Sequence, residues 1–208
     1  MYKRQNIIFT NPKQAFLDAE NAKNEGYYFI HPFDGPLTLQ GSATLGLEIV
    51  EYLKSINTKI DNLLISVGGG GLISGVSSYV KQFYPKIKII GVEPENANGL
   101  NQSLRANKPL NNVNVNSIAD SLSAPLHMQY SFDVAKEVID EMVTVSDDEM
   151  KKFMVFCYKK FKLFLEPACV AGLAALKYKI NNKLIGKNTM VILCGSNIDK
   201  KTWSDLTN

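Results

Sequence analysis

Four consecutive glycines, Gly68, Gly69, Gly70 and Gly71, form the feature of this chain that most directly predicts chemistry. They follow a short, apolar, β-branched run at residues 63–67, which is typical of a buried parallel strand. They precede residues 72–80, whose apolar side chains recur at helical spacing. A strand that turns through glycine into a helix presents backbone N–H groups and the positive end of the helix dipole. The pattern therefore predicts a phosphate-binding loop.

Alternative roles fit the glycine run less well. A turn that needs only positive φ is satisfied by one or two glycines, and four cost conformational entropy, which favours close approach to a ligand. A nucleoside triphosphate loop needs a Gly-Lys pair, and none follows the run here. The dinucleotide fingerprint fails by one residue, with Gly75 as its third glycine, although Glu93 ends the next strand, where a ribose ligand would lie. A nicotinamide-dependent oxidoreductase is thus a less favoured alternative.

Composition limits the class of protein. The chain has 208 residues, enough for one domain or slightly more, with 45% hydrophobic residues. Its net charge of +3 is too small to predict nucleic-acid binding, and its lysines are scattered. No apolar run is long enough to span a membrane. Three cysteines without metal-type spacing favour a reducing compartment, so we expect a cytoplasmic location.

Helical and strand patterns alternate along the chain. Strands are predicted at residues 6–9, 27–30, 63–67, 87–92 and 189–194, and helices at residues 11–23, 45–54, 72–80, 100–105, 131–141, 146–165 and 169–179. Ser146 and Glu149 are expected to form a capping box, and asparagine-rich residues 107–116 a surface loop. This alternation predicts an α/β fold, with a doubly wound, mostly parallel sheet and helices on both faces.

The ordered set of motifs resembles the fold-type II pyridoxal-phosphate enzymes, and within them the threonine/serine dehydratase and serine racemase family. The resemblance extends from about residue 29 to residue 199 and rests on more than the glycine loop. Its segments lie at residues 31–36, 41–49, 66–75, 91–95, 118–122, 143–149, 166–168 and 193–199. It implies that the chain is the C-terminal part of the tryptophan synthase β-like fold.

The resemblance also implies how the cofactor, pyridoxal 5'-phosphate, is held. Its phosphate would lie on Gly68, Gly69, Gly70 and Gly71 with help from the Leu72 amide, and Cys194 would contact the pyridine nitrogen. A neutral thiol partner suits β-elimination more than transamination. The alternative for Cys194 is a small buried hydrophobic side chain, the usual environment of free cysteine.

Three other positions are weaker candidates. In a metal-dependent branch of the family, Glu93 and the Ala97 carbonyl would bind Mg or Ca, but Gly99 stands where an aspartate ligand is expected. The competing interpretation of Glu93 is a surface acid at a strand end. Glu166 would help shape the cofactor pocket, or would merely mark a helix boundary before proline. Ser42 falls in the substrate-contacting segment, which departs from the usual family sequence.

Neither of the two histidines, His31 and His127, has a convincing sequence partner, and no general-base role is assigned to them.

No lysine of this chain lies in the Ser-x-Lys-x-Arg-like segment that carries the cofactor lysine in the family. We therefore expect residues 6–208 to be the C-terminal, cofactor-phosphate-binding portion of the large domain, present as a fragment that is inactive alone. Residues 1–5 match no family segment and are expected to be an artefact of sequence assembly or cloning.

The activity implied for the intact enzyme is β-elimination. A lyase of the threonine/serine ammonia-lyase type (EC 4.3.1) would convert a 3-hydroxy amino acid to a 2-oxo acid and ammonia, and the family is expected to form homodimers. Serine, threonine and other 3-hydroxy amino acids remain open as substrates, as does racemisation. A non-catalytic pseudoenzyme that kept the phosphate loop is the main alternative function.

Overall fold

The computed structural model describes residues 12–207, which belong to two compact units, Met1–His31 and Pro32–Asn208. The strand predicted at residues 6–9 and the short tail at residues 1–5 lie outside the described residues. The expected division into residues 1–5 and 6–208 stays a prediction.

The first unit contains one described helix, α1 (Pro12–Asn24), as predicted. The strand predicted at residues 27–30 is wrong, because this segment has no regular secondary structure. Its large side chains are exposed, Tyr28 by 78% and Ile30 by 74%. Strand-forming residue types need a partner strand for their N–H and C=O groups, and no described strand pairs with this segment.

The second unit contains a four-stranded parallel sheet in the order β3-β2-β1-β4. The strands are β1 (Asn62–Ser66), β2 (Lys88–Pro94), β3 (Glu141–Val145) and β4 (Thr189–Val191). In the register of the sheet, Asn62 stands opposite Lys88 on one side and Thr189 on the other. β1, β2 and β4 lie where strands were predicted, although β4 is shorter. β3 was not predicted.

Seven α-helices of the second unit connect or flank these strands. They are α2 (Pro36–Ser55), α3 (Gly71–Phe83), α4 (Gly99–Ala106), α5 (Gln129–Val138), α6 (Asp147–Phe161), α7 (Pro167–Tyr178) and α8 (Lys200–Thr207), with short 3-10 turns η1 (Glu95–Ala97), η2 (Asp120–Leu122) and η3 (Asn181–Lys183). α2 begins earlier than predicted because Pro36 is preorganised for a first helical position. α8 was missed.

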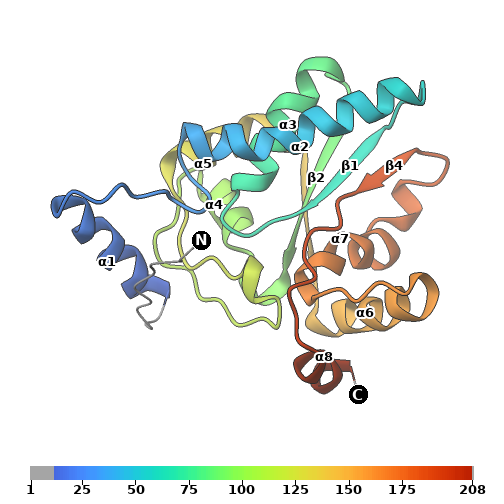
Figure 1. Cartoon of the computed structure of the whole chain (residues 1–208). Coiled ribbons are helices and arrows are strands. Elements are labelled where there is room, and N and C mark those ends of the chain that lie inside the picture. The colour runs from blue at the N-terminus through green and yellow to red at the C-terminus, as the bar shows by residue number, and fades with distance from the viewer. Residues whose placement is uncertain (1–11, 208) are drawn as a thin grey trace, which may run out of the picture. The chain divides into compact units, whose positions relative to one another are not determined.

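The helices cover both faces of the sheet, with α2 and α3 on one side and α6 and α7 on the other (Figure 1). Alternate residues of β1 show this directly. Leu63 and Ile65 pack in the core beneath α2 and α3, whereas Leu64 packs in a smaller cluster on the opposite face. Side chains of a strand alternate between faces, so a strand buried on both sides is apolar throughout. The α/β fold class predicted from the sequence is confirmed.

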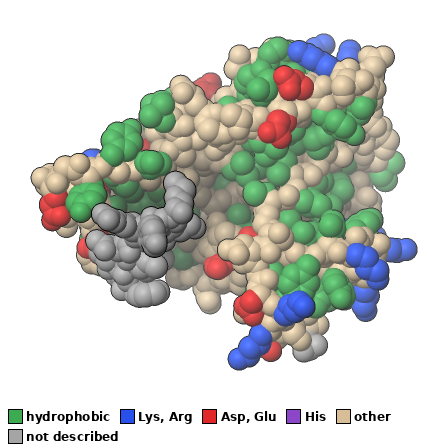
Figure 2. Space-filling model, viewed as in Figure 1, with side chains coloured by type: hydrophobic (Ala, Val, Ile, Leu, Met, Phe, Trp, Pro, Cys, Tyr) green, Lys and Arg blue, Asp and Glu red, His purple; other side chains and the backbone are tan. Residues whose placement is uncertain are grey.

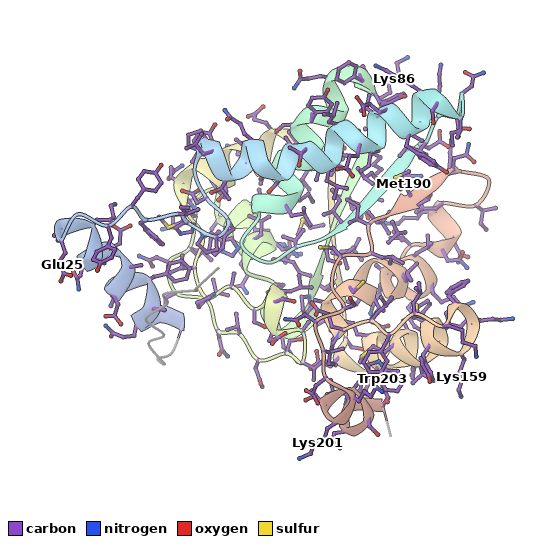
Figure 3. All side chains as sticks on the ribbon, in the orientation of Figure 1. Glu25, Lys86, Lys159, Met190, Lys201 and Trp203 are labelled. Atoms are coloured by element: carbon purple, nitrogen blue, oxygen red, sulfur yellow. The ribbon has the colours of Figure 1, made fainter. Side chains whose placement is uncertain are left out.

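In the C-terminal half, particular residues fix the start of α6 and the packing of α8. The capping box of α6 is present, since the Glu149 N–H donates to Ser146 Oγ and Glu149 Oε2 accepts from the Ser146 N–H. α8 packs on α6 through Trp203, whose ring centroid lies 5.2 Å from that of Tyr158 and 5.0 Å from that of Phe164 (Figure 3). No helix among residues 12–207 is long and apolar enough to cross a membrane.

Candidate cofactor-binding site

A cavity of about 350 Å³ lies at the carboxyl ends of β1 and β4. This is the edge at which open parallel sheets bind ligands, and the volume falls in the range of small-molecule sites. Its lining combines residues 32–33, 66–73, 121–122, 166, 168 and 194–195. The cavity therefore gathers the glycine loop, Glu166 and Cys194, which are far apart in the sequence and were predicted as site residues separately.

The glycine loop is shaped by close neighbours. Gly70 precedes α3 in the left-handed region with φ of 91°, where a side chain would be strained. A Cβ at Gly71 would lie 2.7 Å from Phe33 Cα, and one at Gly68 would lie 3.1 Å from the Ser121 oxygen. The ring of Phe33 covers Gly69. Protein packing, in addition to ligand approach, therefore requires glycine along this loop.

The loop offers a run of unused backbone donors. The first α3 amide with a backbone partner is that of Ser74, which donates to the Gly70 oxygen over 3.0 Å. Within the described residues, the N–H groups of residues 68–73 have no hydrogen-bond acceptor. They lie at the N-terminus of a 13-residue helix, where the dipole adds partial positive charge. The arrangement suits an anion.

No lysine or arginine lines the cavity in the described part of the chain. On the face drawn in Figure 2, most of the Lys and Arg side chains lie beside α2 and α3 and beside α6 and α8. An anion in the cavity would therefore be held by backbone N–H groups and the helix dipole rather than by a cationic side chain.

Ser66 adds a hydroxyl donor to the same cavity. It ends β1 and lines the cavity, and its Oγ is buried without a hydrogen-bond partner among the described residues. A buried hydroxyl without a partner costs free energy. A ligand oxygen in the cavity would satisfy it.

Glu166 holds two walls of the cavity together. One carboxylate oxygen accepts from Ser121 Oγ over 3.0 Å, and the other accepts from the Asn197 N–H over 3.1 Å. Gly195, with φ of 127°, lies directly against this carboxylate, where any side chain would collide with it. Glu166 thus lines the cavity and connects the 3-10 turn η2 with the loop after β4, and its role in shaping a cofactor pocket stays a prediction.

Cys194 lines the cavity beyond the end of β4 and is exposed, whereas Cys157 and Cys169 are buried. Burial raises the pKa of the Cys157 thiol and raises that of Cys169 to about 12. The buried thiols therefore behave as small apolar side chains, and Cys194 is the thiol that a ligand in the cavity can reach.

Glu93 lies outside the cavity and has hydrogen-bond partners of its own. It is fully buried, and its two carboxylate oxygens accept from the Leu100 and Asn101 N–H groups at 2.8 and 3.0 Å, which caps the first turn of α4. Burial raises its pKa to about 8, against the lowering effect of those two amides. The surface position considered for Glu93 is therefore wrong.

The structure adds no support for the metal site. Ala97 is buried in η1, and among residues 12–207 no cluster of three His, Cys, Asp or Glu side chains could hold a metal ion. Glu93 and Ala97 as Mg or Ca ligands stay a prediction.

Ser42 does not line the cavity in the described part of the chain. It lies on α2, where its Oγ donates to the Thr38 oxygen, and its Cβ would be 2.7 Å from a Cβ at Gly75 of α3. Ser42 therefore belongs to the close packing of α2 against α3. A contact of Ser42 with substrate stays a prediction.

Sequence reasoning missed three residues at the site, Phe33, Ser66 and His127. Phe33 and Ser66 stood inside motif segments that were recognised without a role being assigned to these residues. His127 Nε2 lies 3.2 Å from the Gly68 oxygen, although 59 residues separate them. No local pattern signals such a contact, since it depends on how the loop before α5 folds back.

Comparison with known proteins identifies the family of the chain. The family model described as "Pyridoxal-phosphate dependent enzyme" matches residues 5–195, nearly the whole chain. The chain belongs to this family of pyridoxal-phosphate dependent enzymes. Among curated members of the family, the phenylserine dehydratase of Ralstonia pickettii is 38% identical over 204 residues, covering 98% of this chain and 61% of that enzyme. The catabolic L-threonine dehydratase of Escherichia coli (strain K12) is 32% identical, covering 91% of this chain and 56% of that enzyme.

Solved structures of the family share the fold. The processed form of threonine deaminase isoform 2 from Solanum lycopersicum superposes with a TM-score of 0.82 at 34% identity, covering 90% of this chain and 54% of that one. Maize serine racemase gives a TM-score of 0.79 at 28% identity, covering 93% and 59%. The chain therefore spans roughly 55–60% of the length of these relatives.

Proposed function

We propose that this chain forms the cofactor-phosphate-binding part of a pyridoxal-phosphate dependent lyase that removes water and ammonia from a 3-hydroxy amino acid. The dehydratases among its relatives support the reaction class. The observation that carries the proposal is the run of N–H groups without acceptors at residues 68–73, which line a cavity whose described lining has no basic side chain.

The residues present fit the cofactor. A phosphate offers several acceptor oxygens, and the loop offers several adjacent donors with the α3 dipole behind them. The buried Ser66 hydroxyl supplies a further donor. Gly68, Gly69, Gly70, Gly71 and Leu72 are the residues proposed to hold the phosphate.

Cys194 and Glu166 are proposed to form the end of the site opposite the glycine loop. Cys194 lies across the cavity at the end of β4, where a neutral thiol can hydrogen-bond the pyridine nitrogen without adding charge. Glu166 holds the Asn197 backbone and Ser121 in place, which fixes the loop that carries Cys194. When bound, the cofactor supplies the electron sink that stabilises negative charge at the substrate α-carbon.

Binding of the phosphate group can be measured without the reactive aldehyde. Pyridoxamine 5'-phosphate avoids side reactions with the many lysines of the chain, and pyridoxamine without phosphate is the matched ligand. We expect equilibrium dialysis to show binding of the phosphorylated ligand only. Gly71→Ala should abolish it, because the new Cβ would lie 2.7 Å from Phe33 Cα. Gly41→Ala is the control, since a Cβ there meets nothing within 4 Å. Equal affinity for both ligands would contradict the proposal.

The substrate class can be tested with stable conjugates in which the phosphopyridoxyl group is joined to an amino acid through a reduced C–N bond. We expect the L-serine, L-threonine or L-phenylserine conjugate to bind more tightly than the L-alanine conjugate. Identical affinities would favour a phosphate-binding pseudoenzyme. Because no lysine of the chain lies in the family's cofactor-linking segment, we expect the isolated chain to release no ammonia from these amino acids and to form no specific borohydride-reducible adduct.

A cytoplasmic location and a homodimeric assembly of the intact enzyme are part of the same proposal. The location rests on the unpaired cysteines, and the homodimeric assembly rests on the family resemblance alone. Sedimentation of the purified protein tests the assembly.

A further inference from the structure

His127 is a buried side chain that contacts the glycine loop from outside the cavity. The residue is only 4% exposed, and its Nε2 lies 3.2 Å from the Gly68 oxygen. His127 is not among the residues that line the cavity. Its own backbone is fixed, because the His127 N–H donates to the Leu110 oxygen over 2.7 Å. The ring is thus a rigid support behind the loop.

The hydrogen bond to the Gly68 oxygen determines which nitrogen of the His127 ring carries the proton. A backbone carbonyl only accepts hydrogen bonds, so Nε2 must carry the hydrogen in the neutral ring. Nδ1 then holds a lone pair, and this atom is buried with no partner among the described residues. Burial lowers the pKa of His127, which keeps the ring neutral near pH 7. A neutral Nε2–H donor is the form that the geometry requires.

Anchoring the Gly68 carbonyl orients the next amide. The structure has no cis peptide bond among its described residues, and in a planar trans peptide the C=O of one residue and the N–H of the next point in opposite directions. The Gly68 oxygen faces His127, which is not among the residues that line the cavity. The Gly69 N–H therefore faces the side opposite His127, and Gly69 itself lines the cavity.

Glycine is otherwise free to rotate this peptide plane. Gly68 and Gly69 have no side chains to restrict it, and the Gly69 N–H has no acceptor among the described residues. The hydrogen bond from His127 to the Gly68 oxygen opposes a flip of the plane. A fixed donor loses less entropy when the phosphate binds than a rotating one.

Gly99 at the start of α4 makes room for this ring. A Cβ at Gly99 would lie 2.5 Å from His127 Cε1 and 3.3 Å from Nδ1. The Gly99 φ is not in the left-handed region, so a side chain there would not strain the backbone but would crowd His127 most closely and Val113 Cγ1 at 3.3 Å. Residues 68, 99 and 127, from three separate segments, thus form one packed unit.

We propose that His127 is a positioning residue for phosphate binding, which holds the Gly68–Gly69 peptide so that the Gly69 N–H faces the bound phosphate, with Gly99 as the complementary residue that seats the ring. The inference rests on the proposed function, since it concerns the same phosphate loop. It assigns a role to a side chain that touches neither the phosphate nor the reacting atoms.

The wild-type chain alone provides the first test. In ¹⁵N NMR spectra of the imidazole at pH 7.5, we expect a protonated Nε2 and an unprotonated Nδ1. His127→Leu should shift the Gly69 amide resonance and speed its hydrogen exchange before any ligand is added. A protonated Nδ1 with a bare Nε2 in the wild-type chain would overturn the inference.

The second test measures affinity for pyridoxamine 5'-phosphate and for inorganic phosphate. His127→Leu should weaken both roughly three- to tenfold, the worth of one well-placed hydrogen bond. His127→Gln keeps an N–H donor at the end of a side chain of similar reach and should restore most of the affinity. A purely structural role predicts instead that the Leu and Gln variants lose affinity in proportion to their loss of thermal stability.

Gly99→Ala is an independent variant that leaves His127 chemically intact. By displacing the ring it should weaken phosphate binding to a similar extent, and combining it with His127→Leu should cause little further loss. Additive losses would overturn the inference. If the wild-type chain binds neither ligand, the proposed function fails. If it binds and the His127→Leu variant binds equally well, only the role of His127 fails.

Discussion

Phe33 and Gly69 are in direct contact, with the aromatic ring lying where a side chain of residue 69 would be. The same residue also limits Gly71, whose Cβ would come within 2.7 Å of the Phe33 Cα and oxygen. The segment that enters α2 is therefore packed onto the phosphate loop. Glycine is required there by a protein neighbour even before a ligand is considered.

Gly69→Ala should destabilise the folded protein by about 1–3 kcal/mol, the usual cost of forcing extra volume into a packed site. In the Phe33→Ala background the same change should cost much less, because the colliding ring is gone. A double-mutant cycle by urea unfolding measures this coupling.

Gly41→Ala is the matched control for a glycine without close neighbours. A Cβ at this α2 position meets nothing within 4 Å, so the change should stabilise the chain by roughly 0.5–1 kcal/mol through helix propensity. If the Gly69→Ala cost were the same with and without the Phe33 ring, backbone conformation and not the contact would be responsible.

Much of the fold could be predicted because its signals are local. The run at residues 63–67 is apolar at nearly every position, as expected of a strand covered on both faces, and the capping box at Ser146 and Glu149 marks the start of α6. β3 was not predicted from the sequence because its residues Glu141, Met142 and Val143 are only partly buried. Its strand state depends on pairing with β2, about 50 residues earlier in the chain, as in the pair Ile90 and Glu141.

The residues of the site also divide into those that a sequence motif marks and those that no motif marks. Gly68–Gly71, Glu166 and Cys194 carry recognisable neighbours in the sequence, and the cavity brings them together. No sequence motif marks His127, because its partner Gly68 is distant in the chain. The space that its ring occupies also depends on the absence of a side chain at Gly99. Close packing between distant segments is a property of the folded chain that short motifs do not encode.

Glu166→Gln should weaken the connection across the cavity. A glutamine has one acceptor oxygen in place of two, so either Ser121 or the Asn197 N–H loses its acceptor. We expect a loss of stability of about 1 kcal/mol and a weaker affinity for pyridoxamine 5'-phosphate. Glu51→Gln, on the exposed side of α2, is the control for removing one negative charge. If both variants behaved alike, the bridging role of Glu166 would be refuted.

Glu93 should impose a specific pH dependence on stability. Burial raises its folded-state pKa from 4.5 to about 8, so between these values the folded chain holds a proton that the unfolded chain has released. Stability therefore falls as the pH rises through this window, by at most about 1.4 kcal/mol per pH unit. Above pH 8 this contribution becomes constant.

Glu93→Gln removes the titrating group and should flatten this slope, at the cost of one amide acceptor for α4. His127 acts in the opposite direction, because its lowered pKa makes the folded chain lose stability as the pH falls below about 6.5. The difference between the urea-unfolding curves of wild type and variant, taken from pH 5 to pH 9, isolates Glu93. A difference that does not change with pH would contradict the assignment.

Cys194 should be the only one of the three thiols to react rapidly with a thiol reagent such as 5,5'-dithiobis(2-nitrobenzoate) in the folded chain. It is exposed at the cavity, whereas Cys157 and Cys169 are buried and their pKa values are raised. Reactivity follows access and the fraction of thiolate. We expect one rapid equivalent in the native protein, three after unfolding, and none of the rapid phase in Cys194→Ser.

Protection by ligand then tests the place of Cys194 in the cofactor site. Pyridoxamine 5'-phosphate should slow the rapid phase, whereas inorganic phosphate, which occupies only the glycine loop, should slow it much less, because Cys194 lies at the end of β4 and the loop follows β1. Cys194→Ala should weaken binding of pyridoxamine 5'-phosphate by removing the partner of the pyridine nitrogen. Cys194→Ser should preserve binding, since a hydroxyl can make the same hydrogen bond. Equal protection by both ligands would instead indicate that the thiol responds to closure of the phosphate loop and makes no contact with the ring.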